Sequence, residues 1–196
     1  MEMPSQDLSQ LSDDALLVLY ANGDRSAAPL LTSRLLTRVL AQARYMLSDA
    51  AEAEDVAQEA MLRLWRIAPD WRQGEAQVTT WLYRVVANLC LDRLRKKRSK
   101  GLDEIAEPAD PAPSVAQNMQ ERARGDALQN ALDQLPDRQK QAIILRHIEG
   151  LPNPQIAKVM DISPRAVESL TARGKRALAA ILAGRRAELG YEDEAE

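Results

Sequence analysis

The 196-residue sequence has little of what most enzymes and metalloproteins need. Its single cysteine, Cys90, excludes an internal disulfide and any site built from several cysteines. Its single histidine, His147, excludes zinc sites that need a histidine pair and disfavours acid–base catalysis. Only eight glycines are present, and neither common spacing of a glycine-rich phosphate loop occurs. An enzyme is therefore the least favoured class, and we expect no catalytic residues, cofactor or metal ion.

Long hydrophobic stretches are missing as well. No apolar run approaches the roughly 18 residues that a membrane-spanning helix needs. Residues 1–10 carry acidic side chains and lack the basic stretch and apolar centre of a secretory signal. Hydrophobic residues still make up 45% of the chain, which is enough to form a core. We expect a folded cytoplasmic protein without membrane insertion.

Helical periodicity is strong along the chain, and strand-like alternation is weak. Ser12 is expected to cap a first helix that ends at Asn22–Gly23, and Pro69 to end a third helix. Thr79 or Thr80 is expected to cap a fourth helix, and Asn153 a later one. The second helix has a core stripe made of Leu31, Leu35, Val39, Ala43 and Met46.

This periodicity disappears after residue 98, where glycine, prolines and acidic residues predict a linker. The predicted fold is all-α: two small helical domains joined by an acidic flexible linker. The expected boundaries are 5–98 and 119–184 for the domains, 99–118 for the linker and 185–196 for an acidic tail. Whether the free chain is compact or extended stays open.

The net charge of −3 hides two basic blocks. Residues 61–100 carry ten basic and three acidic side chains, and residues 136–186 carry ten and four. An acidic segment separates the blocks, and acidic segments also flank them at either side. This pattern suggests two nucleic-acid contacts, although solvated helix faces would also explain it.

Three helix faces stand out within these segments. A polar stripe on the third helix includes the apolar Leu62, a hint of an interface, although an ordinary surface helix explains it too. Tryptophans beside cations and an asparagine suit single-stranded nucleic acid, unless the rings are core or partly buried residues. This set is Trp71, Arg72, Gln73, Trp81, Arg84, Asn88 and Arg95. Residues 153–183 read as a helix-turn-helix, or as a plain helical hairpin, with a candidate major-groove face of Arg165, Ser169, Arg173 and Arg176.

Several motifs together resemble the sigma-70 family of RNA polymerase sigma factors. Asp-Val-Ala-Gln-Glu-Ala at 55–60, Trp-Leu-Tyr-Arg-Val-Val-Ala-Asn at 81–88 and the basic run at 93–98 resemble the second domain of that family. Leu-Pro-Asp-Arg at 135–138, Ile-Ala at 156–157 and Ser-Pro-Arg-Ala-Val-Glu-Ser-Leu at 163–170 resemble its fourth domain. The short linker and the lack of a third domain between the two resemble the domain organisation of the extracytoplasmic-function (ECF) group.

The resemblance implies a role for each face. The polymerase contact would be the β′ clamp helices, bound by Asp55, Gln58, Glu59 and Leu62. The β subunit of core RNA polymerase is expected as a further contact. Residues 71–77 and Asn88 would read and melt the −10 promoter element. Ser169 and Arg173, with Arg165 nearby, would read the −35 element. An anti-sigma factor is expected as a further partner.

Two departures limit what the resemblance transfers. Glu168 stands where some members have an arginine, and the 71–78 loop lacks phenylalanine, so neither base preference carries over. The two DNA elements lie about one and a half DNA turns apart, or about 50 Å. An extended stretch of about 25 residues, the linker with its flanking residues, spans about 80 Å and can bridge them.

Other classes of protein remain possible. An autonomous helix-turn-helix regulator would bind operator DNA without polymerase, but it would leave the 55–66 stripe and the 71–88 cluster unused. A helical adaptor that never touches DNA conflicts with the basic blocks.

Overall fold

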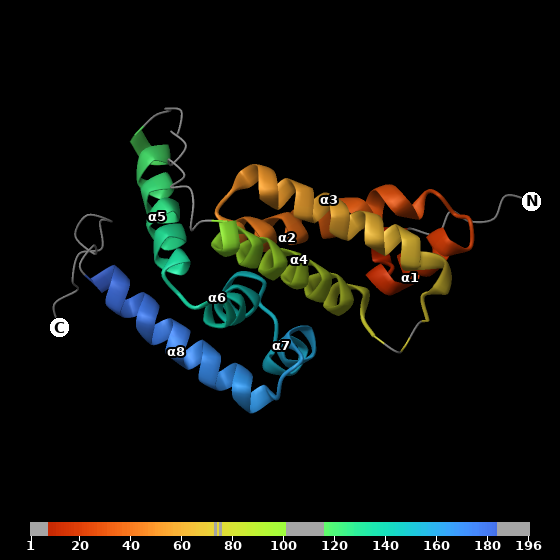
Figure 1. Cartoon of the computed structure of the whole chain (residues 1–196). Coiled ribbons are helices and arrows are strands. Elements are labelled where there is room, and N and C mark those ends of the chain that lie inside the picture. The colour runs from red at the N-terminus through yellow and green to blue at the C-terminus, as the bar shows by residue number, and fades with distance from the viewer. Residues whose placement is uncertain (1–7, 73, 75, 101–115, 184–196) are drawn as a thin grey trace, which may run out of the picture.

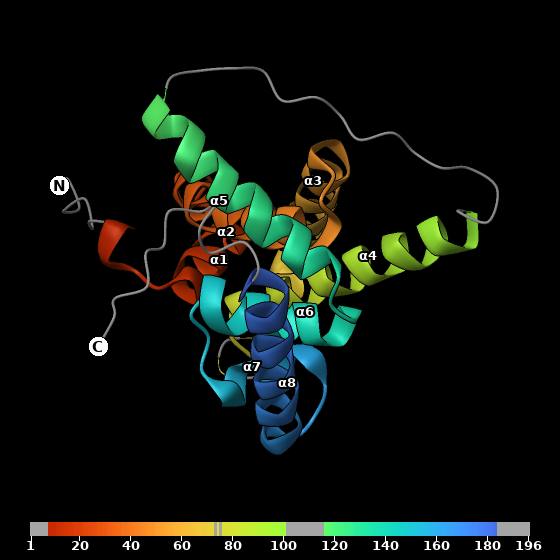
Figure 2. The same ribbon diagram turned by 90° about the vertical axis from the view of Figure 1, so that its left-hand side faces the viewer.

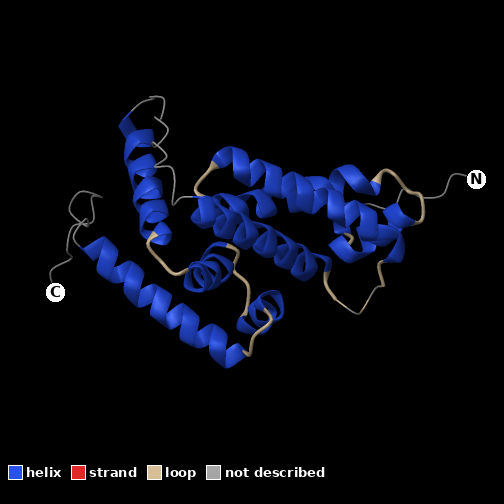
Figure 3. Cartoon of the chain, in the orientation of Figure 1, coloured by secondary structure: helices blue, strands red, loops and turns tan. Residues whose placement is uncertain are grey.

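The computed structural model describes residues 8–72, 74, 76–100 and 116–183. Within these ranges every regular element is a helix, so the predicted all-α class is confirmed (Figure 3). Residue 73, most of the predicted linker and the predicted acidic tail lie outside the described residues. The main helices are α1 (Asp13–Ala21), α2 (Ala27–Leu47), α3 (Ala50–Ile67), α4 (Val78–Lys100), α5 (Ala116–Asp133), α6 (Asp137–Ile143), α7 (Asn153–Met160) and α8 (Pro164–Ala183). Short turns of other helix types are η1 (Leu8–Gln10), η2 (Ala68–Asp70) and the π-helical η3 (Ile144–Ile148).

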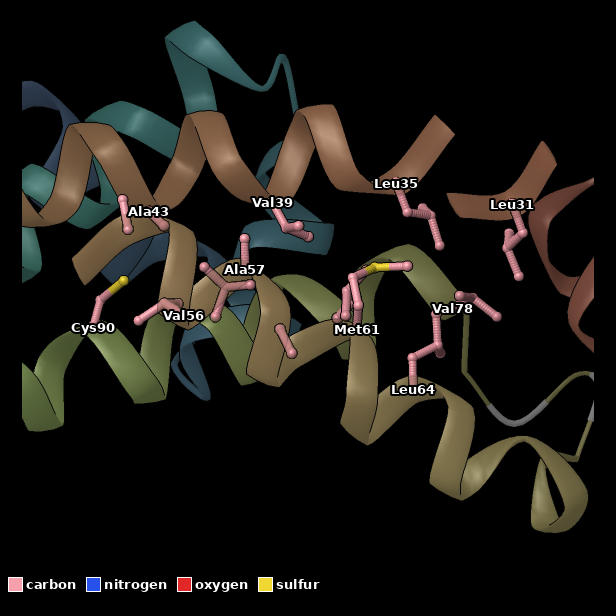
Figure 4. Packing of buried hydrophobic residues seen from close by; sticks show 14 of the residues in the cluster. Leu31, Leu35, Val39, Ala43, Val56, Ala57, Met61, Leu64, Val78 and Cys90 are labelled. Carbon is pink, nitrogen blue, oxygen red and sulfur yellow. The ribbon is translucent and has the colours of Figure 1, made fainter. Parts of the chain in front are cut away.

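The first domain packs α2, α3 and α4 alongside one another, with α1 at one end (Figure 1). The predicted α2 stripe is confirmed, since all five of its side chains are at most 1% exposed. They pack against Val56, Ala57 and Leu64 of α3 and Cys90 of α4 (Figure 4). Each fully buried large aliphatic side chain contributes about 2 kcal/mol. This core fixes which faces of α3 and α4 point outward.

The sequence predicted some of the helix ends of this domain correctly and others wrongly. Ser12 caps α1 as predicted, its Oγ accepting from the Ala15 amide at 3.2 Å, and Gly23 supplies the left-handed φ of 97° after the helix. The predicted cap of α4 at Thr79 or Thr80 is wrong. That helix begins at Val78, whose amide donates to Asp14 Oδ1 at 3.0 Å. The carboxylate comes from another helix, so no local sequence signal reports it.

The second domain contains the predicted helix-turn-helix. Asp161, at φ 54°, reverses the chain after α7, and Ser163 Oγ accepts from the Ala166 amide at 3.2 Å at the start of α8. The predicted cap at Asn153 is wrong by one position. Pro152 already holds the extended conformation of a cap residue, so Asn153 becomes the first helical residue.

Three successive residues where α6 meets η3 pack the two domains together. Ile143, Ile144 and Leu145 are 4%, 0% and 0% exposed, and each belongs to a different hydrophobic cluster. Ile143 packs in the α5–α8 cluster, Ile144 enters the core of the first domain, and Leu145 packs in the helix-turn-helix core. Successive helical residues point about 100° apart, so neighbours must enclose this segment on most sides. Figures 1 and 2 show α6 between α8 and the first domain.

A buried lysine strengthens the same junction. The Lys140 side chain is 5% exposed, and its Nζ donates to the Met46 carbonyl at 2.8 Å and to Asp133 Oδ1 at 2.6 Å. Asp133 also accepts from Ser48 Oγ at 2.5 Å. The C-terminal end of α2 thus contacts the second domain through a compact polar network. The two domains therefore touch, a point that the sequence left open.

Replacing each of two helical glycines by alanine should change the free energy of unfolding in opposite directions. A Cβ on Gly125 of α5 would meet nothing within 4 Å, whereas a Cβ on Gly174 of α8 would lie 2.8 Å from Ile143 Cγ1. Gly125→Ala should raise the free energy of unfolding by up to about 1 kcal/mol through helix propensity. Gly174→Ala should lower it by about 1 kcal/mol, because crowding exceeds that gain. Urea unfolding measures both, and a stabilised Gly174→Ala variant would contradict the close α6–α8 packing.

Candidate interaction surfaces

The polar stripe on α3 faces outward as one surface. Asp55 and Gln58 are exposed, Glu59 is partly exposed, and Leu62 is 47% exposed. Arg63 Nε donates to Glu59 Oε1 at 2.8 Å, and this hydrogen bond lowers the pKa of Glu59. The stripe therefore presents carboxylates and an amide around an apolar side chain, a composition typical of a protein contact.

The predicted nucleic-acid face of α4 is only partly open. Trp71 and Trp81 are half-buried and meet edge to face, with ring centroids 6.2 Å apart. Arg84, Asn88 and Arg95 are exposed along the helix, as is Arg72 in the loop before it. Gln73 lies outside the described residues. This partial burial is what the interpretation as core or partly buried residues expects, and base stacking by these rings stays a prediction.

All four residues of the candidate major-groove face of α8 are exposed. Arg165, Ser169, Arg173 and Arg176 lie on one side of the helix, and Arg173 Nη2 donates to Ser169 Oγ at 3.0 Å. The opposite side is closed by Val167 and Gly174, which are buried. A rigid helix that presents cations and hydroxyls suits phosphates and base edges in a major groove.

A polar contact between the domains was not predicted. The Tyr83 hydroxyl of α4 donates to Glu149 Oε2 at 2.6 Å, just after η3. Burial and the facing carboxylate raise the pKa of Tyr83. Burial likewise raises the pKa of Glu149, although Tyr83 and Arg38 oppose that shift. No spacing in the sequence links positions 66 residues apart, so only the fold brings this pair together.

The single histidine and the single cysteine both have pKa values shifted by burial. Across the described ranges, no cluster of three histidine, cysteine or acidic side chains could hold a metal ion. Burial, with Lys175 and Arg146 nearby, lowers the pKa of His147, and burial raises the pKa of the Cys90 thiol to about 12. In that same part of the chain, no helix combines the length and apolar content that crossing a bilayer requires.

Comparison with known protein families matches both domains. Residues 31–100 match the model described as Sigma-70 region 2, and residues 125–178 match Sigma-70, region 4. The ECF RNA polymerase sigma factor SigM of Mycobacterium tuberculosis is 32% identical over 171 residues, which cover 87% of this chain and 85% of that protein.

Solved structures have the same fold. One is CnrH in complex with the cytosolic domain of CnrY, with a TM-score of 0.68 at 24% identity, covering 88% of this chain and 97% of that one. Another is RpoE of Bartonella quintana in complex with the anti-sigma factor NepR, with a TM-score of 0.63 at 21% identity, covering 78% and 94%. At these identities the likeness concerns the arrangement of the helices.

The raised pKa of Glu149 predicts that ionisation of this carboxyl lowers the free energy of unfolding. Between the ordinary value of 4.5 and its raised value, the folded chain holds a proton that the unfolded chain has lost, so stability falls as the pH rises. Glu149→Gln removes this titration and keeps an acceptor for Tyr83. The variant should exceed the native chain in free energy of unfolding at pH 7, with the difference shrinking below pH 4.5. Urea unfolding across this range measures it, and a difference independent of pH would contradict the assignment.

Proposed function

Because this chain belongs to the ECF group of the sigma-70 family, we propose that it is a bacterial transcription initiation factor that binds core RNA polymerase and directs it to specific promoters. The observation that carries this is the presence, on one chain, of a protein-binding stripe and two separate cationic faces. The chain acts by binding rather than by catalysis, and it works in the cytoplasm, where polymerase and promoter DNA are.

The α3 stripe binds the β′ clamp helices of the polymerase, and the β subunit lies within reach of the rest of the chain. Asp55, Gln58 and Glu59 supply acceptors and an amide, and Leu62 supplies the apolar centre. Interfaces draw most of their binding energy from a few desolvated side chains, and an exposed leucine ringed by polar groups suits that role.

The face of α4 and its preceding loop bind the −10 element as a single strand. Trp71 and Trp81 offer aromatic surface to an extruded base, and Asn88 can pair with a base edge. Arg72, Arg84 and Arg95 follow the phosphates, and Gln73 belongs to the same loop in the sequence. Melting then results from binding single-stranded DNA better than duplex, without ATP.

The face of α8 binds the −35 element in the major groove. Arg165, Ser169 and Arg173 point to bases and phosphates, with Arg176 one turn further along. Each domain alone binds weakly. Polymerase holds the two domains at the promoter spacing, which raises the effective concentration of the second contact once the first has formed.

An anti-sigma factor is a further partner in this proposal. One solved structure that shares the fold is the sigma factor RpoE in complex with the anti-sigma factor NepR. A protein that covers the α3 stripe would keep this chain off polymerase until a signal releases it, as in a stress or envelope response.

The alternative is a helix-turn-helix regulator that acts without polymerase. It explains the α8 face but gives no role to the α3 stripe or to the match of residues 31–100 with region 2. The two functions differ in one measurable requirement, which is core polymerase.

Leu62→Asp should weaken binding to core polymerase by about tenfold to a hundredfold, because it places a charge at the centre of the contact. Leu36→Asp is a matched control, since Leu36 is the other large exposed apolar side chain in the described ranges, at 39%, and lies on α2. Binding of labelled chain to purified core enzyme, followed by run-off transcription, measures the effect.

Equal affinity of the Leu62→Asp and Leu36→Asp variants for core polymerase would contradict the role of α3 in the interface. Tight, sequence-specific duplex binding by the free chain, with no dependence of transcription on it, would favour the regulator instead.

Asn88→Ala and Arg173→Ala should each reduce promoter binding by the holoenzyme by about tenfold, because each removes contacts to one element. The Asn88 defect should vanish on a promoter whose −10 element is scrambled, and the Arg173 defect on one whose −35 element is scrambled. Lys175→Ala, an exposed cation off the α8 face, controls for lost charge. Footprinting on a promoter selected from a library measures this, and element-independent defects would refute the assignment.

A further inference from the structure

One charged segment of the sequence has no role in the proposed function. This acidic segment, residues 187–196, carries five acidic side chains and no lysine or arginine. It follows α8 in the sequence, and the described part of the chain ends with that helix at Ala183. Arg185 and Arg186 precede the segment and can neutralise at most two of its five carboxylates. At least three negative charges therefore remain available to a partner elsewhere.

The two basic helices differ in how their arginines are paired. Every arginine of α4 contacts a carboxylate, and the pairs are Arg84 with Asp161, Arg93 with Glu52, Arg95 with Asp92 and Arg98 with Asp137. The three arginines of α8 are Arg165, Arg173 and Arg176, and all are exposed. Within the described ranges none of the three has a carboxylate partner. Arg173 and Arg176 donate to neutral groups of their own helix, on Ser169 and Ala172.

The charge of α8 is therefore left uncompensated. Lys175 is a fourth cation on this helix, and Glu168 is its single carboxylate, so four positive charges and one negative give a net charge of +3. Helix α8 packs against α5, α6 and α7. Figure 1 shows these three helices on one side of α8, which forms the outer edge of the second domain. The cationic face is thus open to an acidic chain that runs alongside it.

The acidic segment is long enough to reach these cations. At about 1.5 Å per residue, Arg176 lies about 10 Å and Arg165 about 27 Å along the helix from Ala183. An extended chain spans about 3.5 Å per residue at most, so residues 184–193 cover up to about 35 Å. The carboxylates at positions 192–194 can therefore lie beside any of the three arginines.

Tethering makes a weak attraction sufficient. Each exposed ion pair contributes little to stability by itself. A segment joined to its binding site by a few residues, however, has an effective concentration in the millimolar range. A fivefold preference for the bound form corresponds to about 1 kcal/mol, which three exposed pairs together can supply.

The same cations are the ones assigned to the −35 element. Carboxylates and phosphates are both anionic oxygen acceptors for a guanidinium group, so one arginine cannot serve the segment and the DNA backbone fully at once. An occupied face binds every duplex more weakly by the same factor, because only the unoccupied fraction is competent. A duplex held only by α8 is then released, whereas polymerase that is docked on a promoter supplies further contacts and overcomes the competition.

We propose that the acidic segment binds Arg165, Arg173 and Arg176 of α8 and competes there with DNA phosphates. It thereby lowers the affinity of the free chain for duplex DNA of any sequence. The inference rests on the proposed function, since it takes the α8 face as a DNA contact. The basic end of α4 is the other cationic surface within the described residues, and the pairing of its arginines disfavours it as the binding site.

A zero-length cross-link locates the segment. A carbodiimide joins a carboxylate to a neighbouring lysine amine. Lys175 is exposed next to Arg176 on α8, and Lys96 and Lys97 are exposed near the end of α4. In dilute full-length chain, mass spectrometry should find the segment joined to Lys175 at least about threefold more often than to Lys96 and Lys97 together. Excess duplex DNA should suppress the Lys175 product. Equal or preferential joining to the α4 lysines would overturn the proposal.

Removing charge tests the competition. The neutralised variant is Glu192→Gln/Asp193→Asn/Glu194→Gln/Glu196→Gln. The matched control removes four carboxylates between the domains and is Asp103→Asn/Glu104→Gln/Glu107→Gln/Asp110→Asn. Both variants change the net charge of the full chain from −3 to +1. At about 50 mM salt the neutralised variant should bind a labelled duplex about fivefold more tightly than the native chain, and the control within about twofold of it. The gain should shrink as salt screens the pairs. Fluorescence anisotropy measures both affinities.

Equal gains in the two variants would overturn the proposal, because net charge alone would then explain the tighter binding. Arg173→Ala distinguishes this result from a failure of the proposed function. If α8 does not bind DNA, Arg173→Ala leaves duplex affinity unchanged in both the native chain and the neutralised variant. If only the role of the acidic segment is wrong, Arg173→Ala still weakens duplex binding, while the neutralised variant and its control bind alike.

Discussion

The burial of three successive apolar residues on three sides governs this structure. Ile143, Ile144 and Leu145 each enter a separate hydrophobic cluster, so the short α6–η3 segment is enclosed by α8, by the first domain and by the helix-turn-helix. A helix that is apolar around its circumference is stable in water only when it is covered. The second domain therefore cannot expose this segment without cost, and its position against the first domain follows.

The polar contacts divide into two kinds around that centre. Lys140 donates to the Met46 carbonyl in the buried interior, and the Tyr83 hydroxyl donates to Glu149 at a partly buried position. Losing one partner there leaves a group that is shielded from water unsatisfied. Arg84 and Asp161 meet in solvent, where the attraction is screened and exchange with another anion costs little. The first kind keeps the domains together, and the second kind occupies a side chain of the proposed −10 surface. This division lets one contact persist while the other is exchanged.

The sequence predicted which helices form better than it predicted where they begin and end and what they pack against. The α2 stripe and the Ser12 cap follow from local periodicity and local hydrogen bonding, so both were predictable. The start of α4 depends on Asp14, 64 residues away, and the Tyr83–Glu149 pair depends on how the domains pack. One signal was present but unused: the run of Ala142 to Leu145 is apolar on every side, which already requires a second covering surface. The roles of the three faces remain predictions that the proposed variants address.

The carboxylate of Asp14 has a practical consequence for dissecting the molecule. The region 2 match begins at residue 31, yet α1 precedes it and supplies both the acceptor for the Val78 amide and the fully buried Leu16 and Leu17. Arg34 further ties the entry to α1 onto α2, through the Leu11 carbonyl and Asp13. A fragment trimmed to the family boundaries would start with an open core and an uncapped α4. A loss of stability or binding in that fragment would then reflect damage at its own N-terminus rather than the absence of the second domain.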